Sequence, residues 1–174
     1  MSSVRGIVLT PHGFVDGSIA FTSEGRIRNV SGVAVSEAAA LASGRPLVLP
    51  GFIDLHVHGA GGADVMEGGD AAARISAMHA QHGTTSMLAT TMTAPMEDLV
   101  HAMSALSGIC QHRKKGAARI LGVHLEGPYI NDARLGAQPA FARPVANEEL
   151  TALNQLAPIK LITMAPEVPG NMEI

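Results

Sequence analysis

The sequence contains a single cysteine, Cys110, so no disulfide can form within the chain. Disulfides persist in oxidising compartments, and their absence fits a reducing one, so we expect a cytoplasmic protein. The first residues carry no long apolar stretch after Arg5, which predicts no secretory signal peptide. No uninterrupted apolar run approaches the roughly 18 residues that a membrane-spanning helix requires, so we expect no membrane association.

Positive charge is also scarce, because 12 lysines and arginines stand against 15 aspartates and glutamates, for a formal net charge of -3. A nucleic-acid-binding surface needs clustered lysine and arginine side chains. The one short basic run, at 112–115, is better explained as the solvated last turn of a helix, where cations interact favourably with the helix dipole. The charge pattern therefore predicts no nucleic-acid partner.

Hydrophobic residues make up 47% of the 174 residues and charged residues 16%, a composition that predicts a globular chain with a core. Residues 1–48 contain three short apolar or alternating segments, at 6–10, 17–21 and 26–30. This pattern predicts a small antiparallel β unit, and the alanine-rich segment 36–43 fits either a helical turn or a loop.

After Pro50 the sequence alternates between apolar strands and amphipathic helices. We predict strands at 49–57, 84–90, 119–126 and 159–165, and helices at 71–82, at 95–115 and from Asn147. Such alternation is typical of parallel βαβ units. A complete (β/α)8 barrel takes about 250 residues, whereas about 125 follow the β unit. We therefore predict an α/β fold in which residues 49–174 form the first half of a TIM-type barrel from a longer protein, with a swapped or complemented half as the alternative.

Two histidines, His56 and His58, end the first predicted strand. Side chains two residues apart on a strand point to the same side, so these two imidazoles can face one point. Neutral imidazole is a common ligand for zinc and similar metals. The alternative is a pair of polar residues that merely ends a strand, but the glycine-rich exit at 59–62 favours the metal site.

The other predicted strands also end in polar residues. Glu126 ends the third strand, where a carboxylate can bind a metal or hold a water molecule, with a solvated turn glutamate as the alternative. In an α/β barrel this edge of the sheet carries the chemistry. We expect Asp54 to orient the first-strand loop, and His124 to be a packed, hydrogen-bonded side chain. The hydroxyls after the second strand either line the pocket or cap the next helix: Thr90, Thr91 and Thr93.

Several short motifs follow one another along the chain: PGFIDLHVHG at 50–59, GAGG at 59–62, GTT at 83–85, HLEGPY at 124–129 and MAPE at 164–167. The first resembles the first-strand signature of the amidohydrolase superfamily. The others, at their spacing, are similar to those of the N-acetylglucosamine-6-phosphate deacetylases within that superfamily. The resemblance extends over essentially the whole chain.

This resemblance implies a (β/α)8 barrel beside a small β-sandwich built from both chain ends, so that residues 1–48 supply part of the sandwich. It implies hydrolysis of the acetamide of N-acetylglucosamine 6-phosphate to glucosamine 6-phosphate and acetate, a step of amino-sugar catabolism. It also implies a divalent metal cofactor, zinc first with iron, manganese or cobalt as alternatives, and one or two ions. The expected partners are a small phosphorylated amino sugar and, for the full-length protein, a second copy in a homodimer.

In the family, the glutamate matching Glu126 binds the catalytic metal, and the histidine pair matching His56 and His58 can hold a second one. These three residues are the predicted metal ligands. The family's catalytic aspartate and its further metal-binding histidines would lie beyond Ile174. We therefore predict no catalytic residue within this chain, and no activity of the chain alone.

Three residues near the third strand's end are predicted to bind substrate: Gly127, Tyr129 and Gln138. Gln138 falls where many family members have a histidine near the substrate, and an exposed loop glutamine is the alternative. Another amidohydrolase, such as a cyclic-amide hydrolase, is a competing function, but the bridging lysine of many such enzymes has no counterpart, since Lys160 lies early in its strand. A non-catalytic metal-binding or structural fragment is the alternative from a different class.

Overall fold

The computed structural model describes residues 2–173, which fall into two compact units, Met1–Pro50 and Gly51–Ile174. Each unit has its own four-stranded sheet. Across the described residues, no helix is both long and apolar enough to cross a membrane.

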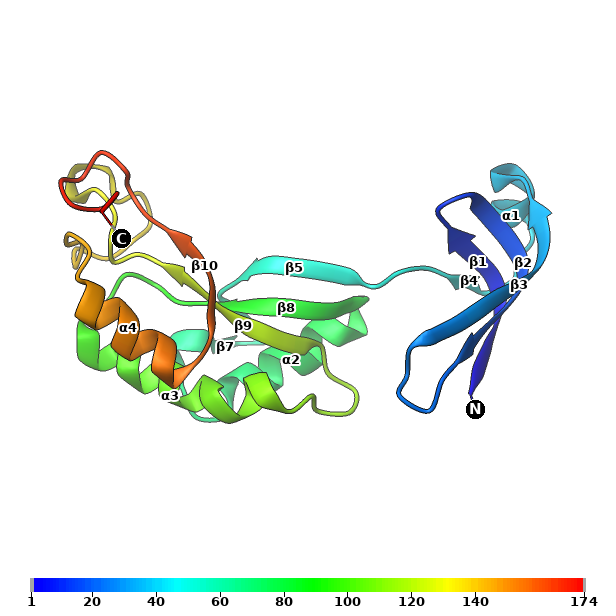
Figure 1. Cartoon of the computed structure of the whole chain (residues 1–174), viewed down its shortest axis with the longest axis horizontal. Coiled ribbons are helices and arrows are strands. Elements are labelled where there is room, and N and C mark those ends of the chain that lie inside the picture. The colour runs from blue at the N-terminus through cyan, green and yellow to red at the C-terminus, as the bar shows by residue number, and fades with distance from the viewer. Residues whose placement is uncertain (1, 174) are drawn as a thin grey trace. The chain divides into compact units, whose positions relative to one another are not determined.

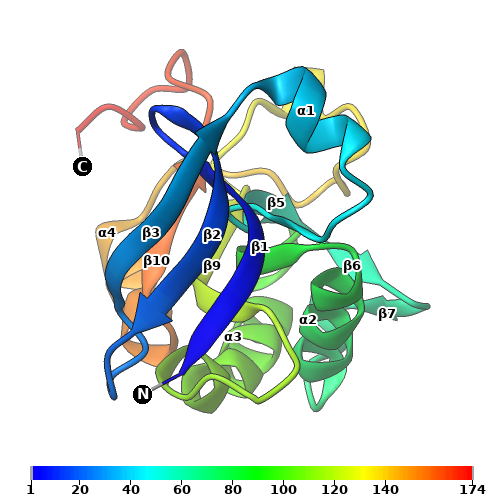
Figure 2. The same ribbon diagram turned by 90° about the vertical axis from the view of Figure 1, so that its right-hand side faces the viewer.

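The first unit is a mainly antiparallel sheet in the strand order β3-β2-β1-β4. Its elements are β1 (Ser3–Thr10), β2 (Gly13–Phe21), β3 (Ile27–Val35), α1 (Glu37–Ala42) and β4 (Leu47–Val48). Figure 2 shows β1, β2 and β3 side by side. Ser36 caps α1 by accepting the Ala39 N–H, which resolves the segment 36–43 as a short helix.

The second unit is a four-stranded parallel sheet in the order β10-β9-β8-β5, with α2, α3 and α4 on one face (Figure 1). Its strands are β5 (Phe52–Val57), β8 (Thr84–Thr90), β9 (Arg119–Glu126) and β10 (Ile159–Thr163). Its helices are α2 (Ala71–Gln81), α3 (Met96–Gln111) and α4 (Asn147–Leu156). Each helix links two neighbouring parallel strands, so the predicted βαβ pattern is confirmed. All the carboxyl ends of the strands therefore lie at one edge of the sheet.

The core of this unit lies between the sheet and its helices. Fully buried apolar side chains from every layer meet there, among them Ile75, Leu99, Met103, Ile120, Leu125 and Leu153. Met103, on α3, is part of this core and has no exposed surface. This packing fixes the strands, and with them the edge that carries the polar residues.

The opposite face of the sheet is apolar and open. Leu55, Leu88, Leu121 and Leu161, with Lys160, line a hollow of about 380 Å³ on it. On β5, Ile53 and Leu55, which are two residues apart, remain 64% and 53% exposed. In a barrel this face is the interior, filled by inward-pointing side chains from all the strands. A half barrel leaves this surface exposed.

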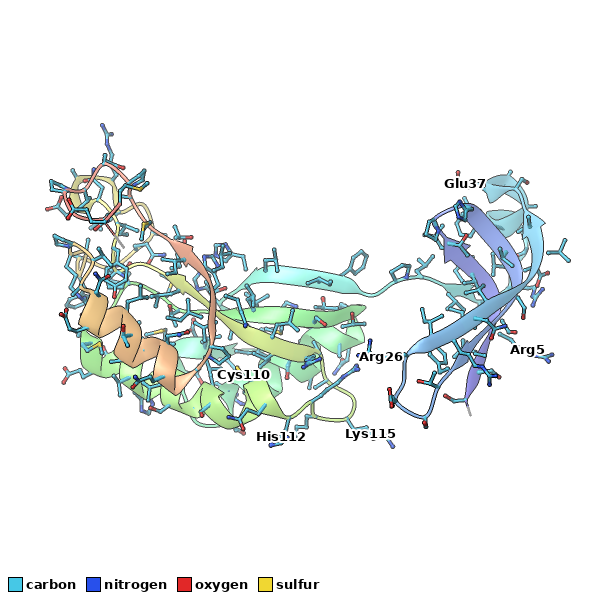
Figure 3. All side chains as sticks on the ribbon, viewed as in Figure 1. Arg5, Arg26, Glu37, Cys110, His112 and Lys115 are labelled. Atoms are coloured by element: carbon cyan, nitrogen blue, oxygen red, sulfur yellow. The ribbon has the colours of Figure 1, made fainter. Side chains whose placement is uncertain are left out.

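The helix predicted over 95–115 extends too far toward the C-terminus. The helix ends at Gln111 rather than near 115, and Figure 3 shows His112 and Lys115 in the segment that follows. The apolar side of α3 packs on the core as far as Ile109 and Cys110, whereas residues 112–115 are exposed, and a helix without tertiary packing has little stability of its own. The basic run 112–115 is thus a loop, and the prediction of a helical last turn is wrong.

Short elements also went unpredicted. They are the hairpin of β6 (Gly59–Ala60) and β7 (Ala63–Asp64), and the 3-10 turns η1 (Val65–Glu67) and η2 (Asp132–Arg134). β4 was not predicted either, and the strand predicted at 49–57 begins only at Phe52, as β5. The hairpin follows β5 directly, and its turn glycines, Gly61 and Gly62, both have positive φ. The Val65 N–H that follows it donates to His58 O at 2.7 Å, so the chain stays close to the end of β5.

Candidate metal centre

His56 and His58 lie at the carboxyl end of β5 with their rings edge-on, at an interplanar angle of 70°. Their centroids are 4.9 Å apart and their Nε2 atoms 3.0 Å apart. The pairing of β5 with β8 is irregular between Asp54 and Val57. There the Asp54 carboxylate accepts the His56 N–H at 3.1 Å, which agrees with the expectation that Asp54 orients this loop. Val57 donates its N–H to the Thr90 hydroxyl at 2.9 Å, tying the loop to β8.

Glu126 reaches the same point from β9, although β8 separates β5 from β9 in the sheet. Its Oε2 lies 2.8 Å from His58 Nε2 and 3.1 Å from His56 Nε2. The side chains are 51% exposed for His56, 30% for His58 and 18% for Glu126. The three groups therefore form a cluster that is open to solvent on the His56 side and enclosed around the carboxylate.

The three ligand atoms fit a divalent ion. They lie within 4.8 Å of one another, and residues 2–173 contain no other such group of three His, Cys, Asp or Glu side chains. Two imidazoles and a carboxylate are a donor set that zinc and other first-row metals accept. Glu126 Oε2 and His58 Nδ1 are buried without an aligned hydrogen-bond partner. A buried carboxylate oxygen without a donor is costly, and a cation at this point would satisfy it.

His124 packs beside this cluster as a hydrogen-bonded neighbour. Its Nε2 lies 2.8 Å from the Thr163 hydroxyl and its Nδ1 3.4 Å from that of Thr90. Its ring stands edge-on to His56 at 4.9 Å. Burial, and then the nearby His56, hold the pKa of His124 below its usual value. Both ring nitrogens are engaged, as expected of a packed histidine.

The threonines at the end of β8 and just after it do not line an open pocket, because Thr90, Thr91 and Thr93 are all fully buried. None of them caps α3 either, since its N-cap position is Pro95. Thr90 instead supports β5, as described above. Both predicted roles for this group are therefore wrong.

Tyr129 corrects a predicted substrate contact. Its side chain has no exposed surface, and its hydroxyl donates to Glu149 Oε1 at 3.1 Å. Its backbone oxygen accepts from the Asn171 amide at 2.8 Å and from the Ala165 N–H at 2.9 Å. Burial, and then the neighbouring Glu149 carboxylate, raise the pKa of Tyr129 well above its usual value. Tyr129 is therefore a structural residue that a sugar cannot reach.

The partners of Tyr129 were not predicted. Glu149, on α4, also accepts from the Arg143 guanidinium, at 2.8 and 3.2 Å. The fully buried Asn171 accepts the Val145 N–H at 2.8 Å and donates to Ala165 O at 2.9 Å. A hydrogen bond between polar residues far apart in the chain leaves no periodic pattern, so no signal in the sequence singles out these contacts.

Replacing Tyr129 by phenylalanine should lower the free energy of unfolding by about 1.5–3 kcal/mol, because the variant loses a hydrogen bond to a charged group. Urea unfolding of the two proteins measures the difference. Affinity for Zn²⁺ should stay within about twofold of the parent, since Tyr129 does not reach the cluster. A loss of affinity without a loss of stability would contradict the structural role.

The other two predicted substrate residues are Gly127 and Gln138. Gly127 directly follows Glu126, and Gln138 contacts the segment after β8. Gly127 is buried with φ +69°. Gln138 Oε1 accepts the Thr93 N–H at 2.8 Å, and its Nε2 lies 3.7 Å from Met92 Sδ. Gln138 is thus half-buried and anchored, which excludes the alternative of an exposed loop glutamine.

Comparison with known proteins places this geometry in a family. The sequence profile of the amidohydrolase family matches residues 47–158, well over half of the chain. The chain belongs to the amidohydrolase family. Members are generally dependent on divalent metals, which agrees with the cluster at the sheet edge.

Among curated amidohydrolase relatives, N-acetylgalactosamine-6-phosphate deacetylase of Escherichia coli O157:H7 is 33% identical over 172 residues, covering 95% of this chain and 44% of the relative. N-acetylglucosamine-6-phosphate deacetylase of Bacillus subtilis strain 168 is 37% identical over 134 residues, covering 74% of this chain and 34% of the relative. The chain thus spans less than half the length of these relatives.

Solved structures of amidohydrolases share the fold. N-acetylglucosamine-6-phosphate deacetylase from Thermotoga maritima superposes with a TM-score of 0.80 at 27% identity, over 99% of this chain and 44% of that one. A variant of the Mycobacterium smegmatis enzyme, solved with N-acetyl-D-glucosamine-6-phosphate, gives 0.75 at 29% identity, over 98% and 46%. The prediction of an α/β fold with the first half of a TIM-type barrel is confirmed.

Proposed function

We propose that this chain supplies the metal-binding part of an enzyme that hydrolyses the acetamide of N-acetylglucosamine 6-phosphate to glucosamine 6-phosphate and acetate. The observation that carries the proposal is the convergence of His56, His58 and Glu126 at the carboxyl edge of a half barrel. Family membership and deacetylase relatives at 33% and 37% identity support the reaction class.

In this proposal His56, His58 and Glu126 hold one or two divalent ions, with zinc preferred. Such an ion, when bound, activates water as a nucleophile and polarises the amide carbonyl. Hydrolysis needs both effects, because an amide is a poor electrophile and water at neutral pH is a poor nucleophile. Glu126 supplies the negative charge that favours a cation at a half-buried point. His56, the most exposed of the three, leaves the ion accessible from solvent.

A proton must also pass to the leaving amine, and a carboxylate is suited to that transfer. The Asp54 carboxylate is engaged with the His56 N–H, and Glu126 is assigned to the metal. We therefore assign no catalytic acid or base within residues 2–173, and place the aspartate in the part of the relatives that this chain does not span. The isolated chain is expected to bind metal without turnover.

The proposal extends to the partners of the whole protein. We expect a cytoplasmic homodimer that acts on a small phosphorylated amino sugar. A cyclic-amide hydrolase is less well supported, because Lys160 lines the apolar hollow on the open face of the sheet and does not lie at the end of β10. It therefore cannot take the part of a metal-bridging lysine at the strand end.

Acetate release tests the proposal. The purified 174-residue chain with Zn²⁺, Mn²⁺ or Co²⁺ should release no acetate from N-acetylglucosamine 6-phosphate above the metal blank. A chimera that joins this chain to the unmatched remainder of the B. subtilis relative should release acetate. N-acetylgalactosamine 6-phosphate is assayed in parallel, because the E. coli relative is named for that sugar.

Two outcomes would contradict the proposal. Turnover by the 174-residue chain itself would show that it needs no further catalytic group. A folded, metal-loaded chimera that opens a cyclic amide such as dihydroorotate, but leaves both amino sugars intact, would overturn the deacetylase assignment. Circular dichroism and metal analysis of the chimera separate these outcomes from simple misfolding.

A further inference from the structure

Two side chains of the segment between β9 and α4, Gln138 and Arg143, bond to the segment after β8. Gln138 lies within this connection and uses both ends of its amide: Oε1 accepts the Thr93 N–H at 2.8 Å, and Nε2 contacts Met92 Sδ at 3.7 Å. The backbone of Gln138 is itself held in a turn, since its N–H donates to Leu135 O at 3.0 Å. The amide therefore presents a fixed acceptor to Thr93.

Thr93 in turn rests against the residue that follows Glu126. A methyl group built on Gly127 would lie 2.0 Å from Thr93 Oγ1 and 3.3 Å from Thr93 Cα, so the two backbones are in close contact. Gly127 also donates its N–H to Thr163 O at 3.3 Å, across to β10. Thr93 and Thr163 thus hold Gly127 between them.

We propose that Gln138 is a positioning residue for Glu126, a role that rests on the proposed metal centre. The contacts run from the Gln138 amide to Thr93, from Thr93 to Gly127, and from Gly127 along one peptide to Glu126. The Glu126 carboxylate must stay about 3 Å from two imidazole nitrogens to share an ion with them. A small backbone shift at Gly127 moves the carboxylate away from the two nitrogens.

A second contact limits the size of the effect. Arg143 Nη1 donates to Ala94 O at 3.0 Å, so the same turn keeps one anchor when the Gln138 amide is lost. We therefore expect a variant without the amide to fold, with Thr93 and Gly127 less firmly held. Outer-shell partners of metal ligands are worth about 10–100-fold in metal affinity, and the lower end applies here.

The test compares two replacements of Gln138 in the 174-residue chain. Gln138→Leu removes the acceptor, and Gln138→Glu keeps it. Leucine should weaken Zn²⁺ binding about 10-fold and speed amide hydrogen exchange at Thr93 and Gly127 by about 10-fold. Glutamate should leave both within about threefold of the parent. The control is Gln155→Leu, the same substitution at an exposed position of α4, which should change neither.

Faster exchange at Thr93 alone, with Gly127 exchange and metal affinity unchanged, would make Gln138 a loop anchor and overturn the proposal. Equal effects of leucine and glutamate would overturn it as well. If the parent chain binds no Zn²⁺, the metal centre itself fails, and the exchange rate at Gly127 alone decides whether Gln138 positions the end of β9.

Discussion

Replacing Glu126 with glutamine is expected to weaken Zn²⁺ binding by about 100-fold or more, beyond the 10–100-fold range typical of outer-shell partners. Glutamine has nearly the same shape, but it removes the negative charge that lies 2.8 and 3.1 Å from the two imidazole nitrogens. A neutral amide oxygen is also a poorer ligand for zinc than a carboxylate oxygen. Competition titration against a chromophoric chelator measures the change.

The control for this variant is Glu167→Gln. Glu167 lies just after β10, is fully exposed and accepts from the Asn131 amide, so the same charge is removed close to the same edge of the sheet. Its affinity for Zn²⁺ should match the parent. If both variants lose affinity alike, general electrostatic attraction binds the ion. If neither does, the ion lies elsewhere.

Replacing Gly127 with alanine is expected to destabilise the chain by roughly 2–5 kcal/mol, through two costs that add. Its φ of +69° is strained for any residue with a side chain. The new methyl carbon would also lie 2.0 Å from Thr93 Oγ1, so one of the two segments must move. The midpoint of urea unfolding reports the loss.

Gly136→Ala separates these two costs. Gly136 has a similar φ, +63°, but nothing lies within 4 Å of the position that its methyl group would take. It should therefore lose only about 1 kcal/mol, the conformational part. Equal losses in the two variants would show that Gly127 is not tightly packed against Thr93, and would also weaken the positioning role of Gln138.

The cluster of His56, His58 and Glu126 could be predicted from the sequence because strand geometry is regular. A two-residue period puts His56 and His58 on one side, and parallel strands bring their ends to one edge, so Glu126 falls near them. What the sequence does not contain is the curvature that lets β5 and β9 meet across β8. That arises from how the strands and the helices behind them pack.

Contacts between particular side chains could not be predicted from the sequence. Tyr129 follows the glycine-proline step after β9, which suggested a place at the site, yet its hydroxyl bonds to Glu149, 20 residues away. Gln138 similarly finds the Thr93 N–H, 45 residues away. Neither partner has a periodic or local signal. Nor does the end of α3 at Gln111 have such a signal.

Anomalous diffraction at the zinc edge, from crystals of the 174-residue chain grown with Zn²⁺, tests the central claim most directly. The account predicts one strong peak between His56 Nε2, His58 Nε2 and the Glu126 carboxylate, and its loss in the Glu126→Gln variant. Well-ordered side chains at these three positions with no peak between them, or a peak held by other histidines, would contradict it.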